Sequence, residues 1–143
     1  MKKILVLIVF FMITGALFAE EVDLEKAFMF PQKWEGKEIT ISKRTNYIRI
    51  GEVERAGENY YLNVYGYDGK LIRYPPSDPV DFLLSPEMAE KWLDYYDPLL
   101  SYFYELATEE YLTGKLRKDI YGWYFRITEI KIVRPSGTID LIK

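Results

Sequence analysis

The feature that most limits the fold is an alternation of apolar and polar residues over 37–55 whose phase changes twice. The apolar positions are first odd, then even, then odd again: Ile39, Ile41, Ile48, Ile50 and Val53. A strand that keeps one face inward must shift by one residue at each change, which is what a β-bulge does. Gly51 lies at the second change, where a bulge costs least. The pattern therefore predicts one long, bent strand over 37–55.

The dipeptide Asp68-Gly69 predicts a hairpin between two further strands, at 60–67 and 70–75. A two-residue loop would place Arg73 opposite Val64, on the apolar face of the hairpin. A three-residue loop over 67–69, with Gly69 in the left-handed conformation, instead pairs Val64 with Ile72. We expect the longer loop, because it keeps one face of the hairpin apolar.

Ser85-Pro86-Glu87 predicts the start of a helix, because it supplies a capping hydroxyl, a proline and an acid in the first turn. Asp97-Pro98 repeats the pattern, so we expect helical structure at about 86–107. Apolar alternation predicts the remaining strands, at 110–118, 122–134 and 138–142. Residues 20–36 form a lead-in segment, and 37–143 form one domain without repeats or linkers.

Aromatic residues are crowded into the helical region. We expect Trp92, Tyr96 and Phe103 to face inward and to close one end of the β-structure. An exposed surface that binds a partner protein is the alternative for these rings.

The order of elements is a bent strand, a hairpin, a helix and a second hairpin. This order resembles the OB-fold, a five-stranded barrel with a helix between its third and fourth strands. The residues that carry the resemblance are Gly51 in the first strand, 61–64 in the second, 112–116 in the fourth and 125–133 in the fifth. The resemblance spans about 37–134 and implies a mainly β chain of order β-β-β-α-β-β. Other small five-stranded barrels are the alternative.

The first 19 residues have the three parts of a secretory signal peptide. Lys2 and Lys3 are followed by ten apolar residues, 4–13, and by Ala19 before an acidic pair. The apolar stretch is shorter than the roughly 20 residues that a bilayer span needs. We therefore expect export to the periplasm or the outside of the cell, with cleavage after Ala19. An uncleaved N-terminal anchor is the alternative.

The chain contains no cysteine and no histidine. This composition excludes thiol nucleophiles, Ser-His-Asp catalysis, disulfides and zinc sites of the Cys/His type. Paired carboxylates could still act as acid and base, but no two acids are spaced in a pattern typical of such a site. Since calcium-binding and phosphate-binding loops are also absent from the sequence, we expect no enzyme, cofactor or metal. One Gln and three Asn among many charged residues are typical of thermophilic proteins.

Charge is divided unevenly along the chain. Residues 78–110 hold nine acids and one base, whereas 115–134 hold six bases and two acids. The predicted sheet is therefore basic and the predicted helix acidic. OB-folds bind ligands on the face of strands two and three and on the flanking loops. The resemblance therefore implies these ligand-binding residues: Tyr61, Tyr65, Arg73, Arg55, Lys118 and Tyr121.

Aromatic rings beside cations suit both sugar rings and stacked bases. We expect a non-catalytic binding or accessory module of the cell envelope, whose ligand is a protein partner or a glycan. The alternative is single-stranded nucleic acid or another polyanion, bound through the basic sheet. Export and the net charge of −3 disfavour that alternative.

Overall fold

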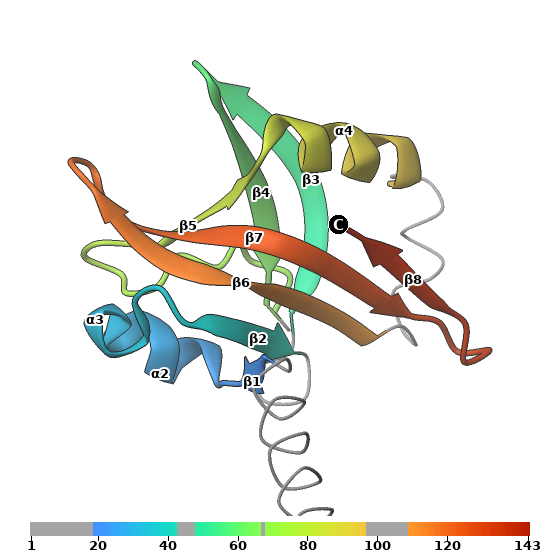
Figure 1. Cartoon of the computed structure of the whole chain (residues 1–143), viewed down its shortest axis with the longest axis horizontal. Coiled ribbons are helices and arrows are strands. Elements are labelled where there is room, and N and C mark those ends of the chain that lie inside the picture. Colours follow the sequence, from blue (N-terminus) through green and yellow to red (C-terminus); the bar gives the residue numbers. More distant parts are fainter. Residues whose placement is uncertain (1–18, 43–47, 67, 97–108) are drawn as a thin grey trace, which may run out of the picture.

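The structure is a computed structural model that describes residues 19–42, 48–66, 68–96 and 109–143. In this part of the chain, eight strands form one open mixed sheet and three short helices accompany it (Figure 1). The predicted mainly β class is confirmed. The described residues do not show a closed five-stranded barrel. The short strands at 20–21 and 81–84 were not anticipated, whereas the strand at 139–142 matches the one predicted at 138–142.

The sheet joins segments that are distant in the sequence. Its order is β1-β2-β6-β7-β5-β4-β3, and β8 pairs with the far end of β7. β1 runs parallel to β2 and β5 runs parallel to β7, whereas all other neighbours are antiparallel. The bounds are β1 (Glu20–Glu21), α2 (Leu24–Met29), α3 (Pro31–Trp34), β2 (Glu38–Ser42), β3 (Arg49–Ala56), β4 (Asn59–Tyr65), β5 (Asp81–Leu84), α4 (Pro86–Tyr95), β6 (Glu109–Asp119), β7 (Gly122–Val133) and β8 (Ile139–Ile142).

The strand predicted over 37–55 is found as two strands, β2 and β3, on either side of 43–47, which lie outside the described residues. The bulge predicted at Gly51 is confirmed, because the pairing of β3 with β4 shifts its register between Ile50 and Val53. Gly51 is buried, and a Cβ atom there would lie 2.5 Å from the ring of Tyr65. A larger residue at this position would therefore have to displace the ring of Tyr65.

The hairpin after β4 has the predicted register. Tyr65 is bridged to Leu71, and the N–H of Ile72 donates to the carbonyl of Val64 at 2.7 Å. Gly69 has a φ of 73°, as the three-residue loop requires. The sequence pattern therefore identified both the turn and its pairing.

The strand predicted at 70–75 is wrong, because pairing with β4 does not continue beyond this start of the hairpin. Three prolines (Pro75, Pro76 and Pro79) occupy the stretch that follows, and proline cannot donate to a sheet ladder. β5 replaces the predicted strand as the partner of β4, through the pairs Tyr60–Leu84 and Tyr61–Leu83.

The start of α4 is as predicted. The Ser85 hydroxyl accepts a hydrogen bond from the N–H of Met88 at 3.2 Å, and Pro86 is the first helical residue. The helix ends at Tyr95, and the second helical piece expected up to 107 lies outside the described residues, as does Phe103.

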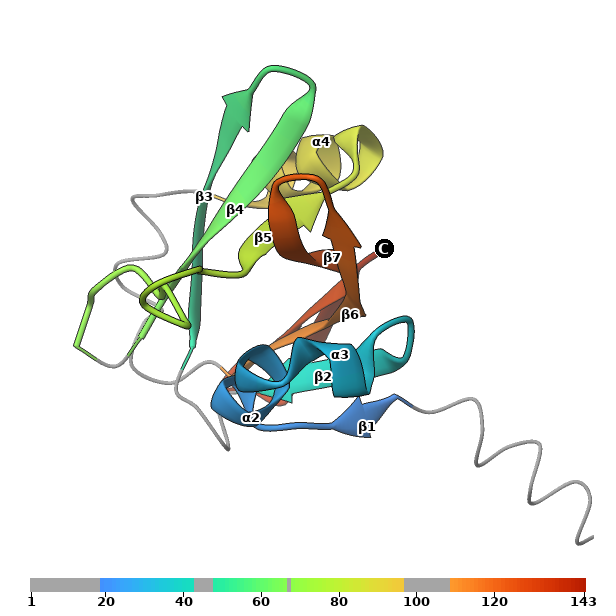
Figure 2. The same ribbon diagram turned by 90° about the vertical axis from the view of Figure 1, so that its left-hand side faces the viewer.

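Helices α2 and α4 both contribute side chains to one core. In both Figures 1 and 2, β6 and β7 lie between α2 and α3 on one side and α4 on the other. The Phe28 ring of α2 lies 5.4 Å from Phe82 and 6.0 Å from Phe125. From α4, the buried Trp92 donates its indole N–H to the carbonyl of Gly51 at 2.8 Å. Tyr96 stacks on Trp92 and is partly buried against the same core, as expected for the inward face.

The segment at 20–36, expected as a lead-in, contributes four buried side chains to the core: Val22, Leu24, Ala27 and Phe28. It also pairs with the sheet through β1. In the described ranges, no helix is long and apolar enough to cross a membrane.

Candidate functional site

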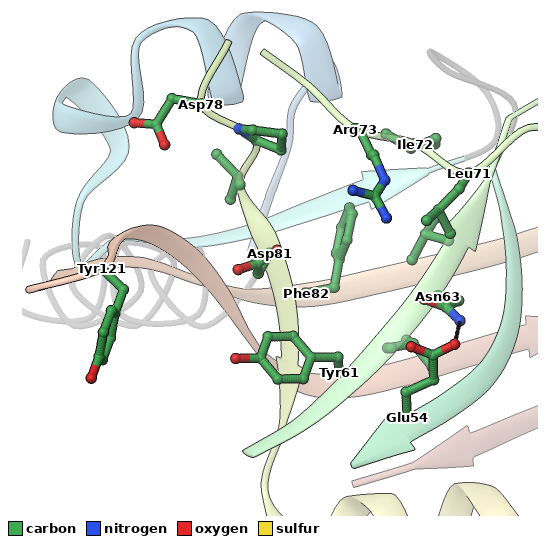
Figure 3. A pocket seen from close by; sticks show the side chains of 14 residues that line it. Glu54, Tyr61, Asn63, Leu71, Ile72, Arg73, Asp78, Asp81, Phe82 and Tyr121 are labelled. Carbon is green, nitrogen blue, oxygen red and sulfur yellow. Dashed lines mark hydrogen bonds between the residues drawn. The ribbon is translucent and has the colours of Figure 1, made fainter. Parts of the chain in front are cut away.

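A pocket of about 370 Å³ opens beside β4 (Figure 3). It forms because β4 is bridged by Leu71 at one end and paired with β5 at the other, and the chain between these contacts runs away from the strand. Its apolar floor consists of core residues, among them Leu62, Val64 and Phe82. Its polar and aromatic lining consists of Glu54, Tyr61, Asn63, Arg73, Asp78, Asp81 and Tyr121.

Strand alternation places the β4 part of this lining. Because Leu62 and Val64 face the core, Tyr61 and Asn63 must face outward. Glu54 is the partner of Tyr61 on β3. The pocket therefore has one wall made from the outer face of the β3–β4 pair.

The opposite wall comes from loops. Arg73 and Asp78 belong to the stretch between the hairpin and β5, and Asp81 is the first residue of β5. Tyr121 stands in the β6–β7 turn, where the Asp119 carboxylate accepts its backbone N–H at 2.8 Å. Its side chain is 88% exposed, so the ring forms the outer rim.

Carboxylates outnumber cations around the pocket. Glu54, Asp78 and Asp81 face a single guanidinium, that of Arg73. Burial raises the pKa of the Asp81 carboxyl, the charge of Arg73 opposes this shift, and Asp119 and Asp78 add to it. The pocket thus presents acceptors and a modest negative charge, which disfavours a polyanion within it.

A hydrogen-bonded cluster holds the β3–β4 wall in place. The Asn63 amide donates to Glu54 at 3.2 Å and to Glu52 at 3.0 Å, and the Tyr65 hydroxyl donates to Glu52. Burial raises the pKa of Glu52, but the hydrogen bonds from Tyr65 and Asn63 outweigh it, so the net shift is downward. The bond to Glu52 raises the pKa of Tyr65 to about 12.

Three of the six predicted ligand-binding residues, Tyr61, Arg73 and Tyr121, line this pocket together. The other three are not part of its lining. Tyr65 is bound to Glu52; Arg55 lies over the Tyr60 ring at 5.6 Å, and Lys118 over the Trp123 ring at 5.7 Å.

Four polar residues of the lining were not among the predicted ones: Glu54, Asn63, Asp78 and Asp81. Asn63 shares the face of Tyr61 by strand alternation, so the sequence contained the signal for it. Asp78 and Asp81 enter the pocket only because β5 replaces the predicted strand. Among the residues that the structure covers, no three acidic side chains are grouped closely enough to hold a metal ion.

Comparisons with models of protein families, with curated proteins and with solved structures found no match. The function is therefore inferred from the pocket and the face around it.

Proposed function

We propose that this protein is an exported, non-catalytic binding module of OB-like architecture whose pocket binds a glycan. The observation that carries the proposal is the lining of the pocket, which combines tyrosine rings with carboxylates, an amide and a guanidinium. A sugar ring has an apolar face and a rim of hydroxyls that donate and accept. Tyrosine supplies an apolar surface with a polar tip, and the planar polar groups supply the matching donors and acceptors.

The OB-like part of the proposal is supported by the strand order β2-β6-β7-β5-β4-β3. The two ends of this path, β2 and β3, are consecutive in the sequence and were expected as halves of one bent strand. A path whose first and last strands are neighbours in the sequence is typical of small barrels. The helix α4 follows β5 and precedes β6, which matches the place of the helix in the OB-fold order.

Export is supported by the signal-like pattern of the first 19 residues. N-terminal sequencing of the protein recovered from the periplasm or the medium tests it, and we expect Glu20 as the first residue. Recovery of the intact N-terminus in the membrane fraction would favour the anchored alternative, and recovery from the cytosol would contradict export.

Single-stranded nucleic acid is the second candidate ligand. It is favoured by cations that lie over aromatic rings on β6 and β7, where Lys131 is 4.4 Å from the Tyr111 ring and Arg126 is 5.4 Å from the Tyr124 ring. The acidic lining of the pocket argues against it. A protein partner would also be compatible with exposed tyrosines, and it is the fallback if no carbohydrate binds.

Titration of the protein with a panel of neutral and acidic oligosaccharides, followed by calorimetry, tests the glycan hypothesis. Tyr61→Ala should weaken binding by about tenfold or more, as expected for a central aromatic anchor. Glu54→Gln should also weaken it, whereas the matched change Glu58→Gln, in the β3–β4 turn outside the pocket, should not. Absence of binding across the panel, or equal loss in the two Gln variants, would refute the proposal.

A further inference from the structure

A row of side chains crosses four strands of the sheet next to the pocket. The register places Tyr61 beside Leu83, Leu83 beside Arg126, and Arg126 beside Lys115. The residues that alternate with them face the core, so the row lies on the outer face: Leu62, Phe82, Phe125 and Leu116 are buried. Neighbouring strands lie about 4.8 Å apart, which puts Lys115 about 14 Å from Tyr61 along this row.

A basic pair lies within this row, which continues beyond Lys115 to its β2 partner Glu38. Arg126 and Lys115 are a directly opposed pair of like charges, an arrangement that destabilises a sheet. Arg117 adds a third cation on the same face of β6, two residues from Lys115. We call Lys115, Arg117 and Arg126 the cationic platform. Within the described part of the chain, none of the three forms an ion pair with a carboxylate.

Leu83 lies between the pocket and the cationic platform. It is only 5% exposed, yet it does not belong to the core cluster, because it lies on the outer face of β5. An apolar residue therefore lies between the tyrosine at the pocket and the cations. At this low exposure Leu83 is covered by its neighbours, so it separates the pocket from the cations without offering a contact surface of its own.

We propose that the glycan is acidic, with one sugar in the pocket and a carboxylate or phosphate group bound by the cationic platform. This inference rests on the proposed function of the pocket. Guanidinium groups bind carboxylate and phosphate in a bidentate manner, and an ammonium adds a point charge. The carboxylates of the pocket repel an acidic group, whereas the cationic platform attracts it. Charge therefore also determines which end of the glycan lies in the pocket.

Matched ligands test the proposal without changing the sugar skeleton. The probes are tetragalacturonate against its methyl ester, and maltotetraose against its phosphate monoester, titrated by calorimetry at two salt concentrations. We expect at least one acidic form to bind about tenfold more tightly than its neutral partner, since hydrogen bonds to charged groups have about that value. Tighter binding of tetragalacturonate would indicate a carboxylate ligand, and tighter binding of the maltotetraose phosphate would indicate a phosphate ligand.

Variants test whether the tighter binding of the acidic probes depends on the cationic platform. Lys115→Gln and Arg126→Gln should each remove most of this extra affinity and leave the affinity for the neutral probes unchanged. Arg126→Lys, which keeps the charge and loses the fork, should restore only part. The matched control Lys26→Gln, an exposed lysine of α2, should change nothing. The melting temperature should stay within about 3 °C in each variant, as is usual for surface substitutions, so a loss of fold is recognisable.

The outcomes separate this inference from the proposed function. Equal affinity for acidic and neutral probes, with Tyr61→Ala still harmful, overturns the acidic glycan and leaves the pocket as a glycan site. An octathymidylate that binds through Lys115 and Arg126 regardless of Tyr61 also overturns it, in favour of nucleic acid. If no oligosaccharide binds at all, both proposals fail.

Discussion

Gly114 lies at a place in the sheet where β6 has no room for a side chain. The pairing of β6 with β7 shifts its register between Thr113 and Gly114, and an added Cβ would overlap the carbonyl oxygen of Arg126. Because the obstacle is backbone, no rotamer change relieves it. We expect Gly114→Ala to lower the free energy of unfolding by about 2–3 kcal/mol, as overpacking of a filled interior does. Urea denaturation followed by circular dichroism measures this change.

Gly66→Ala is the matched control for that measurement. A Cβ at Gly66 would meet its nearest neighbour, Asp68 Oδ1, at 3.4 Å, which is ordinary contact, and Gly66 is not among the glycines with positive φ. The Gly66→Ala variant should be as stable as wild type or slightly more stable, because alanine reduces the conformational freedom of the unfolded chain. Equal losses in both variants would show that Gly114 has no special steric role.

The hydrogen bond from Tyr65 to Glu52 should make stability depend on alkaline pH. The pKa of Tyr65 is raised from 10.0 to about 12, chiefly by this bond. Its contribution is therefore complete below pH 10 and is lost as the pH rises towards 12. We expect wild type to be more stable than Tyr65→Phe at pH 8 by about 1 kcal/mol, the usual net value of a hydrogen bond. This difference should shrink between pH 10 and 12.

Thermal denaturation of both proteins across that range provides the check. A difference in melting temperature that persists at pH 12 would mean that the Tyr65 phenol does not titrate in this range. A difference absent already at pH 8 would mean that the bond adds nothing to stability.

The residues of the site that could be predicted are those placed by local geometry. Tyr61 follows from strand alternation and Tyr121 from its turn, whereas Arg73 follows from the hairpin register that Gly69 allows. Asp81 depends instead on a parallel pairing with Tyr124 that no local pattern encodes. The same holds for Arg126 and Lys115, whose alignment with the pocket requires the order of four strands.

At the scale of elements, α4 is fastened to the bulge of β3 by one hydrogen bond. The Trp92 indole donates to the carbonyl of Gly51 at 2.8 Å in a buried setting. Trp92→Phe keeps an aromatic ring but leaves this carbonyl without its indole donor and creates a void. We expect a loss of about 2–3 kcal/mol in unfolding free energy, from the lost hydrogen bond and the lost volume together. Chemical denaturation by circular dichroism measures it, since the fluorescence of Trp92 is lost in the variant.

Tyr96→Phe is the comparison for this prediction. It retains the ring stacked on Trp92 and removes only a hydroxyl at the partly buried end of the helix. Its effect should be well under half of that of Trp92→Phe. Similar losses in the two variants would show that the bond to Gly51 contributes no more to stability than the Tyr96 hydroxyl does.

Elements with their own start signals were predicted well, and those defined by distant partners were not. Ser85 and Pro86 mark α4 in the sequence, and the register of the β4 hairpin follows from its glycine. β5 is four residues long and follows a proline-rich stretch, so it has neither alternation nor length to distinguish it. It exists because β4 and β7 offer open edges on both of its sides.

At the scale of the whole molecule, the sheet carries opposite charges in neighbouring places. The acidic pocket and the cationic platform lie on one face, separated by Leu83. The overall acidic composition thus conceals a local basic surface, and the segregation of charge along the sequence anticipated it. Pairing of β6 with β7 places Arg126 opposite Lys115, and Arg117 lies two residues further along β6.

The segment from Glu20 to Phe30 is part of the folded domain, so folding should depend on it. Val22, Leu24, Ala27 and Phe28 are all at most 5% exposed, and the N–H of Val22 donates to Thr40 at 2.9 Å. Each large apolar side chain contributes about 1.5–3 kcal/mol when buried, and a whole domain has only about 5–15 kcal/mol. We therefore expect a chain that begins at Glu20 to fold, and one that begins at Pro31 to remain unfolded.

Far-UV circular dichroism and heat denaturation of the two truncated chains test this expectation, with Phe28→Ala as the milder variant. Phe28→Ala should lose about 3–5 kcal/mol, since a ring in contact with Phe82 and Phe125 is replaced by a cavity. Exposed Phe30, at 58%, offers the matched control, because Phe30→Ala creates no cavity and should change little. A cooperative melt of the chain from Pro31 would show that β1 and α2 are dispensable. The core would then have to be complete with the strands and α4 alone, which the contact of Phe28 with both central phenylalanines argues against.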